Sequence, residues 1–287
     1  MTIEKKRLLS GIQPSGILHL GNYFGAMKQF VELQNDYESY VFIANYHAMT
    51  TIKDPKVLLE NTIEVANIYL SIGLNPEKVN LFKQSDVKSV CELSWILSTL
   101  TPMGLLERCH SFKDKIAKGI APDHGLFAYP VLMAADILIY KSDIVPVGKD
   151  QKQHVEVARD IAIKFNNLYG EILKLPEPVI QSDTAIVPGI DGQKMSKSYD
   201  NAISPFDDEK TIKKQVMKIV TDATPLEEPK NPDNSPVFAL YCLVSSKSEI
   251  EEMRNKFLSG GYGYGNAKKE LLEKILYYFK DIRKKYF

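Results

Sequence analysis

The sequence predicts an α/β fold: a Rossmann-like, doubly wound parallel sheet with a helical insertion, followed by an all-helical C-terminal domain. Three observations lead to this prediction. Short apolar segments alternate with amphipathic ones in the first half of the chain, at residues 7–12, 40–44, 79–82 and 144–147. A more helical stretch at residues 85–142 interrupts that alternation. Beyond residue 204, hydrophobic residues recur at helical spacing, which is typical of helices alone.

The apolar segments are expected to be parallel strands whose carboxyl ends share one edge of the sheet. The first ends in the turn Gln13-Pro14-Ser15-Gly16, and a helix is expected to open near Asn22. Asp54-Pro55 is a typical helix start, and Gly73 is a typical helix end. Ligands of open parallel sheets bind beyond the carboxyl ends of the strands, so we expect the site there.

Three further helices follow from hydrophobic spacing. They are expected over residues 131–140, after a cap at Asp150, and over residues 267–286. The sequence therefore predicts a catalytic domain at residues 1–203, with an insertion at about 85–142, and a helical domain at 204–287.

Composition excludes several classes of protein. Its 36 basic and 36 acidic residues balance, which argues against a protein coated in positive charge but allows a local basic face. Three widely separated cysteines predict neither a disulfide framework nor a structural zinc site. No secretory segment is seen, and no apolar run approaches the roughly 18 residues of a membrane span. We expect a soluble, cytoplasmic protein without a membrane partner or a tightly bound metal.

A glycine-containing loop, His19-Leu20-Gly21-Asn22, lies where the first strand gives way to a helix. Glycine allows close approach of a ligand, and a helix N-terminus favours phosphate. His19 and Asn22 can both donate hydrogen bonds to phosphate oxygens. The alternative is an ordinary strand–helix turn with a surface histidine. The spacing matches neither a Walker loop nor a dinucleotide-binding loop.

A second loop, Lys194-Met195-Ser196-Lys197-Ser198, follows Gly189, Asp191 and Gly192, which we take to mark flexible chain. Two lysines three residues apart can both reach one polyphosphate. Such a loop can close over a transition state and supply charge where charge develops. The alternative is a solvated lysine-rich turn, but this five-residue string is far more specific than the first loop.

Together these motifs resemble those of class I aminoacyl-tRNA synthetases. The first loop is similar to their His-Ile-Gly-His element, and the second matches their Lys-Met-Ser-Lys-Ser loop. The strings at residues 10–16, 129–138 and 145–154 resemble those of bacterial tryptophanyl-tRNA synthetases in particular. The similarity covers most of the chain in the expected order. It implies that tryptophan and ATP form tryptophanyl-adenylate and pyrophosphate, after which the tryptophan passes to the terminal ribose of tRNA.

The resemblance also implies an ATP site, with ATP and Mg²⁺ as substrate. Its residues would be Gln13, Pro14, Ser15, Gly21, Asn22, Gly148, Lys149, Asp150, Ile186, Lys194, Met195, Ser196, Lys197 and Ser198. The catalytic roles would fall to Lys194, Lys197 and Asn22, and to Lys113 and Lys115, where the family places a further phosphate-binding lysine.

The implied tryptophan pocket would consist of Leu9, His47, Tyr129, Met133, Asp136 and Gln151. Asp136 sits in an otherwise apolar segment, and an unpartnered buried carboxylate is costly. A carboxylate suits the indole N–H, which only donates. The alternatives are a helix-surface or ion-paired aspartate for Asp136, core packing for Tyr129 and Met133, and a satisfied strand-end residue for His47. Leu9 departs from the aromatic residue that many family members place there.

The implied partners are L-tryptophan, tRNA(Trp) and a second copy of the chain, joined through the insertion. The helical domain would bind the anticodon, and its last helix, rich in lysine, is expected on the tRNA side, with a solvated face as the alternative. Family members continue some tens of residues further, so we expect either a short variant or a truncated sequence.

Three other functions compete with this one. A tyrosine-specific ligase shares the fold and both loops. A nucleotidyltransferase can use a similar histidine loop, but such enzymes usually lack the second loop. A non-catalytic RNA-binding relative would not be expected to keep both Lys194 and Lys197.

Overall fold

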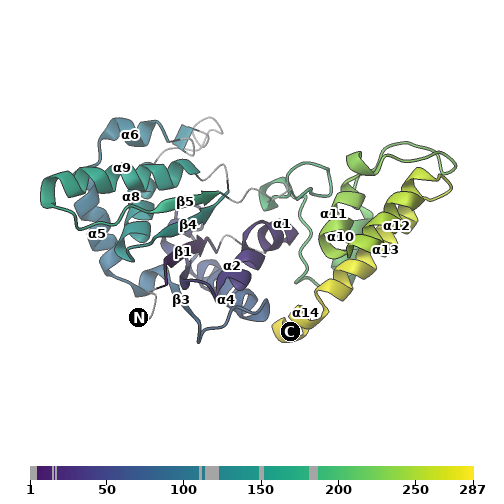
Figure 1. Ribbon diagram of the computed structural model, residues 1–287, viewed down its shortest axis with the longest axis horizontal. Helices are drawn as coiled ribbons and strands as arrows, with labels where there is room; N and C mark the ends of the chain where they lie inside the picture. The colour runs from purple at the N-terminus through teal and green to yellow at the C-terminus, as the bar shows by residue number, and fades with distance from the viewer. Residues whose placement is uncertain are drawn as a thin grey trace. The chain divides into compact units, whose positions relative to one another are not determined.

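The computed structural model has a five-stranded parallel sheet at the centre of its first compact unit (Figure 1). The structure describes residues 5–14, 16, 18–109, 112–113, 123–148, 152–180 and 187–287. The predicted Rossmann-like class is confirmed.

The sheet order is β3-β2-β1-β4-β5. The strands are β1 (Arg7–Ile12), β2 (Glu38–Ile43), β3 (Val79–Lys83), β4 (Ile144–Val147) and β5 (Glu177–Ile180). Four of them were predicted, β1 and β4 with these bounds. β5 was not predicted, because Glu177-Pro178-Val179-Ile180 is short, and proline is typical of an edge strand.

The topological switch point lies between β1 and β4, which are hydrogen-bonded neighbours although distant in sequence. The chain builds one half of the sheet outward from β1 and the other half outward from β4. Their carboxyl ends therefore lie side by side at the edge where such folds bind ligands.

One face of the sheet forms a hydrophobic core with three helices of the same unit (Figure 1). Leu9 of β1, Phe42 of β2 and Val145 of β4 are buried there. The helices are α5 (Ser89–Ser98), α8 (His124–Ile139) and α9 (Lys152–Tyr169). This packing fixes α8, which carries Asp136, against the strand ends.

The other described helices between β2 and β4 are short, except for α4. They are α3 (Asn45–Ala48), α4 (Pro55–Ser71), η2 (Gln84–Asp86) and α6 (Met103–Glu107). The expected start of α4 is confirmed, since the Asp54 carboxylate accepts the N–H groups of Lys56 and Val57. Asp123 caps α8 in the same way by accepting the N–H of Leu126 at 2.7 Å.

A second compact unit combines three stretches of the chain: Ile17–Val31, Asn67–Gly73 and Asp183–Phe287. The helix after the histidine loop therefore groups with the C-terminal helices. Its described elements include the end of α4 and the start of α2 (Lys28–Leu33). The others are α1 (Leu20–Asn22), η1 (Tyr23–Met27), η4 (Lys197–Tyr199), α10 (Glu209–Met217), η5 (Pro232–Asn234), α11 (Pro236–Val244), α12 (Lys247–Leu258), α13 (Tyr264–Tyr278) and α14 (Lys280–Tyr286). The domain boundary at residues 203 and 204 stays a prediction.

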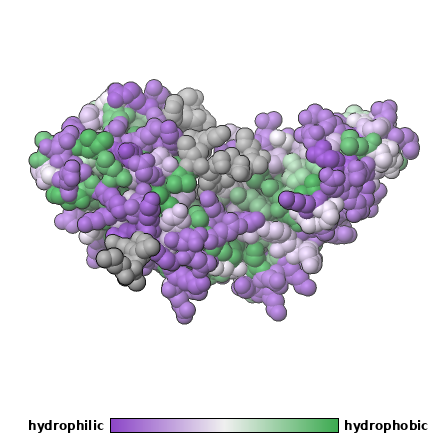
Figure 2. Space-filling view, viewed as in Figure 1, coloured by the Kyte–Doolittle hydropathy of each residue, from purple (hydrophilic) through white to green (hydrophobic). Residues whose placement is uncertain are grey.

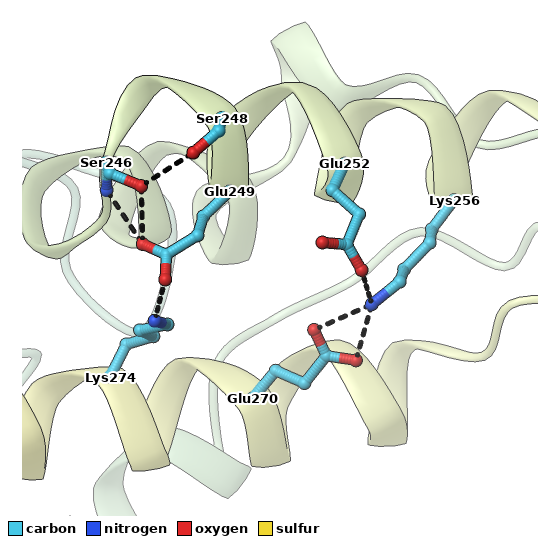
Figure 3. A network of polar contacts seen from close by, with 7 residues as sticks. All are labelled: Ser246, Ser248, Glu249, Glu252, Lys256, Glu270 and Lys274. Atoms are coloured by element: carbon cyan, nitrogen blue, oxygen red, sulfur yellow. Dashed lines mark hydrogen bonds and ion pairs between the residues drawn. The ribbon is translucent and has the colours of Figure 1, made fainter.

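Two ion-pair groups join α12 to α13 (Figure 3). The Glu249 carboxylate accepts from Lys274 and from the N–H and hydroxyl of Ser246, and these hydrogen bonds lower the pKa of Glu249 to about 2. The Lys256 ammonium lies 3.0 Å from Glu252 and 3.2 Å from Glu270.

The helix predicted over residues 267–286 is instead two helices, α13 and α14, that meet at Phe279. Phe279 is fully buried, and its ring centroid lies 4.8 Å from that of Tyr23. The Arg283 guanidinium donates to the backbone carbonyl oxygens of Pro205 and Asp207. Packing of Phe279 thus divides a segment that contains neither glycine nor proline. In the part of the chain that the structure describes, no helix has the length and apolarity needed to cross a membrane.

Candidate active site

Asp136 lies buried on α8, with 1 % of its surface exposed, and two side chains from the strand ends contact it. The Nε2 atom of His47, in α3 just after β2, lies 2.9 Å from Asp136 Oδ2. The Gln84 amide, in η2 just after β3, donates to the same oxygen at 2.7 Å. We call these three residues the Asp136 site. Among the described residues, both contacts reach Oδ2 and none reaches Oδ1.

Backbone contacts hold the Gln84 amide in one orientation. Its Oε1 accepts the N–H of Tyr46 at 3.0 Å, which leaves Nε2 directed at Asp136. Next to it, Asn45 and Ser85 make two reciprocal hydrogen bonds, of 2.9 and 3.1 Å. The two segments that follow β2 and β3 are therefore joined twice beside Asp136.

Sequence reasoning missed Gln84. A single glutamine after a strand belongs to no motif, and its contacts are tertiary. One available signal was its position, since a polar residue that directly follows a buried strand lies at the ligand-binding edge of the sheet.

The electrostatics of the site balance burial against hydrogen bonding. Burial raises the pKa of Asp136, while the contacts with His47 and Gln84 oppose that rise. If the Asp136 carboxyl group is ionised, it can only accept hydrogen bonds, so His47 Nε2 must carry the hydrogen of this contact. The site thus holds a buried carboxyl group oriented through one oxygen.

Tyr129 and His154 extend this polar group along α8 and α9. The Tyr129 hydroxyl lies 3.2 Å from His154 Nε2, and the Tyr129 ring meets the His47 ring edge-on at 6.2 Å between centroids. A cavity of about 430 Å³ opens beside His47 and Tyr129 and is also lined by Trp95 and Leu132. Asp136 itself does not line that cavity.

Of the other residues predicted for tryptophan, Leu9 is buried in the core on β1, and Met133 packs against that core from α8. Met133 therefore has the packing role that was its alternative interpretation. Gln151 lies outside the described residues.

The switch point brings together part of the predicted ATP site. Gln13 is exposed and Pro14 is buried, directly after β1, and Gly148 directly follows β4. Because β1 and β4 are neighbouring parallel strands, these residues share one edge of the sheet.

The histidine loop, residues 19–22, caps its own helix. The Asn22 side chain accepts the N–H of His19 at 3.1 Å, and the Leu20 N–H donates to the carbonyl of Ile203 at 2.9 Å. Burial lowers the pKa of His19 to about 4, so the imidazole is neutral at pH 7. Its Nδ1 is buried without a hydrogen-bond partner among the described residues.

The lysine loop, residues 194–198, is the return side of a small hydrogen-bonded turn. Pro188 and Lys194 form an antiparallel bridge, and the N–H groups of Gly189 and Met195 donate to Gln193 and Val187. The chain before the lysines therefore has defined backbone pairing, whereas its glycines predict a flexible loop. Lys194 and Lys197 are both exposed.

Gly21 and Met195 bring the two loops into contact. A Cβ atom at Gly21 would lie 2.9 Å from His19 Nδ1 and 3.4 Å from Met195 Cβ. Glycine fits there without rearrangement, whereas any side chain would require the His19 ring to shift. The two motifs, which are far apart in the sequence, thus meet within one compact unit.

The other residues predicted for the ATP site are Lys113 and several that the structure does not describe. Lys113 is exposed, and its N–H donates to Cys109. Ser15, Lys115, Lys149, Asp150 and Ile186 lie outside the described residues, as does the side chain of Ser198.

The fold and the two loops define the class of protein. A family model described as tRNA synthetases class I (W and Y) matches residues 2–280, and the chain belongs to this family.

Two relatives with high sequence identity are both tryptophan–tRNA ligases. The chain is 61 % identical to the tryptophan–tRNA ligase of Fusobacterium nucleatum over 98 % of its own length and 86 % of that protein. It is 55 % identical to the tryptophan–tRNA ligase of Campylobacter jejuni, over 98 % of this chain and 88 % of that one.

Solved structures agree with this comparison. The Campylobacter jejuni tryptophanyl-tRNA synthetase complexed with ADP and tryptophan is similar at a TM-score of 0.93 and 55 % identity, covering 98 % of this chain and 88 % of that chain. The tyrosyl-tRNA synthetase of Archaeoglobus fulgidus shares the fold at a TM-score of 0.73 and 22 % identity, covering 100 % of this chain and 92 % of that chain.

Proposed function

We propose that this protein is a tryptophan–tRNA ligase. It forms tryptophanyl-adenylate and pyrophosphate from L-tryptophan and ATP–Mg²⁺, and then transfers tryptophan to the 3′-terminal ribose of tRNA(Trp). The observation that carries the proposal is the buried Asp136 carboxyl group, held through Oδ2 by His47 and Gln84. The tryptophan-specific relatives support the same amino acid.

In this proposal, Asp136 recognises the indole ring. Indole offers one N–H donor and no acceptor, so a carboxylate oxygen is a suitable partner. Among the residues that the structure describes, both contacts to Asp136 use Oδ2, and we propose that Oδ1 accepts the indole proton. A hydrogen bond to a charged group contributes about 1.5–3 kcal/mol, or roughly tenfold to a hundredfold in affinity.

Tyr129, His47 and Gln151 are proposed to hold the polar groups of tryptophan, while Leu9 and Met133 supply apolar walls. The contact of Tyr129 with His154 fixes the hydroxyl that would face the substrate. A leucine at position 9 gives a wall that adapts in shape but lacks a flat ring.

The two loops are proposed to bind the phosphates of ATP. Gly21 and Asn22 supply backbone and amide donors at a helix start, where anions are favoured. Lys194 and Lys197 supply positive charge from the lysine loop, with Met195, Ser196 and Ser198 shaping it. Neutral His19 is suited to donate a hydrogen bond without adding charge.

The proposed chemistry requires positioning more than covalent help from the protein. A carboxylate oxygen of tryptophan attacks the α-phosphorus, and the bond from that phosphorus to the bridging oxygen of pyrophosphate breaks. Charge builds on the phosphoryl oxygens, so fixed donors and cations lower the barrier. Gln13, Pro14, Ser15, Gly148, Lys149, Asp150 and Ile186 are proposed to hold the nucleoside end, and Lys113 and Lys115 a phosphate.

We propose tRNA(Trp) as the third substrate, after tryptophan and ATP, and the cytoplasm as the compartment in which the protein acts. The C-terminal helices are proposed to bind the anticodon. Of the basic residues at the end of the chain, Arg283 and Lys274 already contact carbonyl or carboxylate groups. Lys284 and Lys285 are exposed, and we propose them as the tRNA contacts.

We further propose a homodimer through the insertion. Figure 2 shows patches of hydrophobic residues on the visible face of the part of the molecule that contains the sheet. Trp95 of α5 is 73 % exposed, and Met103 at the start of α6 is 63 % exposed. Exposed patches of apolar side chains, as distinct from single exposed residues, are typical of a protein interface.

Amino-acid-dependent ATP–pyrophosphate exchange tests the proposed function. Exchange should require tryptophan and should be at least tenfold slower with tyrosine at equal concentration. Exchange that depends on tyrosine alone would favour the tyrosine ligase. No exchange with any amino acid, together with adenylylation of another acceptor, would favour a nucleotidyltransferase.

A further inference from the structure

Asn201 is a buried residue that lies three positions beyond the lysine loop and has no role in the function described above. Only 1 % of its surface is exposed. It comes after η4 and after Asp200, whose φ of 50° is in the left-handed region. This turn directs the chain back toward the residues that precede the lysines.

Three groups of the turn and the lysine loop are bound by the Asn201 amide. Its Nδ2 donates to Asp191 Oδ1 at 2.8 Å and to the carbonyl of Lys194 at 3.1 Å. Its Oδ1 accepts the N–H of Ser196 at 2.7 Å. The Asn201 backbone carbonyl also accepts the N–H of Ile190 at 2.9 Å.

These contacts hold the backbone on both sides of the first lysine and just before the second. Lys194 is fixed through its own carbonyl, and Lys197 directly follows the fixed N–H of Ser196. Asp191 is held in turn, because its Oδ1 also accepts the N–H of Gln193 at 3.0 Å. The two exposed ammonium groups therefore extend from a backbone that one side chain organises.

Gly189 completes the arrangement by leaving space for Asn201. A Cβ atom at Gly189 would lie 2.4 Å from Asn201 Cγ and 2.7 Å from its backbone oxygen. Both atoms belong to a fixed, buried residue, so any side chain at position 189 must displace it.

We propose that Asn201 is a positioning residue for the adenylation reaction, which sets the geometry of Lys194 and Lys197 through the backbone of the lysine loop. This proposal rests on the proposed function, since the lysines matter through ATP. Asn201 does not touch substrate. Its amide is suited to the task because it donates to two oxygens and accepts one N–H, which neither aspartate nor serine can do.

Asn201→Asp is the most direct test. The substitution keeps the shape and the acceptor for Ser196 but places a carboxylate against Asp191 and the Lys194 carbonyl. The kcat of tryptophan-dependent exchange should fall by about a hundredfold, as for a misplaced catalytic group, with the KM for tryptophan changed less than about twofold. Asn255→Asp makes the same chemical change at an exposed site on α12 and should leave kcat unchanged.

The double variant Asp191→Asn, Asn201→Asp exchanges the donor and the acceptor. The amide introduced at position 191 can donate to the carboxylate introduced at position 201. The kcat should therefore recover by about tenfold relative to the single variant, one restored hydrogen bond being worth about 1.4 kcal/mol. Gly189→Ala should reproduce the single variant by displacing Asn201. A wild-type kcat in Asn201→Asp would overturn the proposal. So would equal losses in kcat and in tryptophan binding in Asn201→Asp, without recovery in the double variant.

Trypsin cleavage after Lys194 and Lys197 gives a readout that does not depend on the reaction. Cleavage should be about tenfold faster in Asn201→Asp than in the wild type and Asn255→Asp, because loss of the amide contacts, about 1.4 kcal/mol, allows local opening. An unchanged cleavage rate in Asn201→Asp would contradict the proposed role of Asn201. Absence of exchange in the wild-type protein would count against the proposed ligase function alone, because cleavage does not depend on the reaction.

Discussion

Asp136 combines a large cost of burial with contacts to two polar residues that follow strands β2 and β3. A buried carboxyl group is tolerated when donors surround it. The Gln84 amide supplies one donor, the His47 Nε2 atom lies within hydrogen-bond distance, and both residues are themselves buried. We propose that the other oxygen, Oδ1, gives this residue a role in recognition rather than in folding alone.

Replacing Asp136 by asparagine should weaken tryptophan recognition. The amide keeps the shape and one acceptor oxygen for His47 and Gln84, but it removes the charge that accepts the indole proton. We expect kcat/KM for tryptophan in pyrophosphate exchange to fall by about 10–100-fold, mostly through KM. Asp160→Asn, the same change at an exposed position of α9, is the control. An unchanged kcat/KM would refute the assigned role.

His19 should make the protein less stable in mild acid. Its folded-state pKa of about 4 is below the ordinary value of 6.5, because of burial. Between these values the unfolded chain takes up a proton that the folded chain does not, so stability falls as pH drops from 6.5 toward 4. His19→Gln removes this effect. Urea unfolding at pH 7 and pH 5 should show a larger loss in the free energy of unfolding for the wild type than for the variant. Equal losses would show that folding does not lower the pKa of His19.

At the scale of elements, close backbone approaches decide which glycines matter. Gly260 follows α12 with a φ of 72°, and a Cβ there would lie 2.4 Å from the carbonyl oxygen of Glu227. Gly265, in the first turn of α13, has open space around its Cβ position.

These two glycines give opposite predictions for the same substitution. Gly260→Ala should lower the free energy of unfolding by at least about 1–3 kcal/mol, from backbone strain plus the clash. Gly265→Ala should raise it by up to about 1 kcal/mol, because alanine restricts the unfolded chain. Urea denaturation of both variants measures this, and a neutral Gly260→Ala would mean that the turn adapts freely.

Elements with a repeating pattern could be predicted from the sequence, and elements set by tertiary contacts could not. β1 and β4 are confirmed with their predicted bounds, and Asp54 caps α4 as expected. β5 lacks an apolar pattern, and the break at Phe279 follows from its packing against Tyr23.

Residues of the candidate site could likewise be predicted only where they belong to a sequence motif. The specific string at residues 194–198 identified the lysine loop, and family resemblance pointed to Asp136. Gln84 and Asn201 were missed, because a single amide acquires its meaning only from the groups around it. Hydrogen-bond partners far apart in the sequence leave no spacing to detect.

At the scale of the whole molecule, the exposed apolar residues of the insertion predict association. Trp95→Glu should shift the protein toward the monomer, because burying an unpaired charge in an interface is costly. Sedimentation velocity at micromolar concentration measures this. Tyr277→Glu, at a residue of α13 that is 76 % exposed, is the control. A wild type that sediments as a monomer would contradict the proposed dimer.

We propose two separate roles, in which the paired loops act on ATP and the Asp136 site selects tryptophan. The most direct test measures both the exchange rate and tryptophan binding in Lys197→Ala. The exchange kcat should fall by about 10²-fold or more, as when one charge-stabilising donor is removed. Tryptophan affinity should stay within about twofold of wild type in equilibrium dialysis, because Lys197 has no proposed contact with the indole. A variant with normal exchange kcat and poor tryptophan binding would contradict these roles.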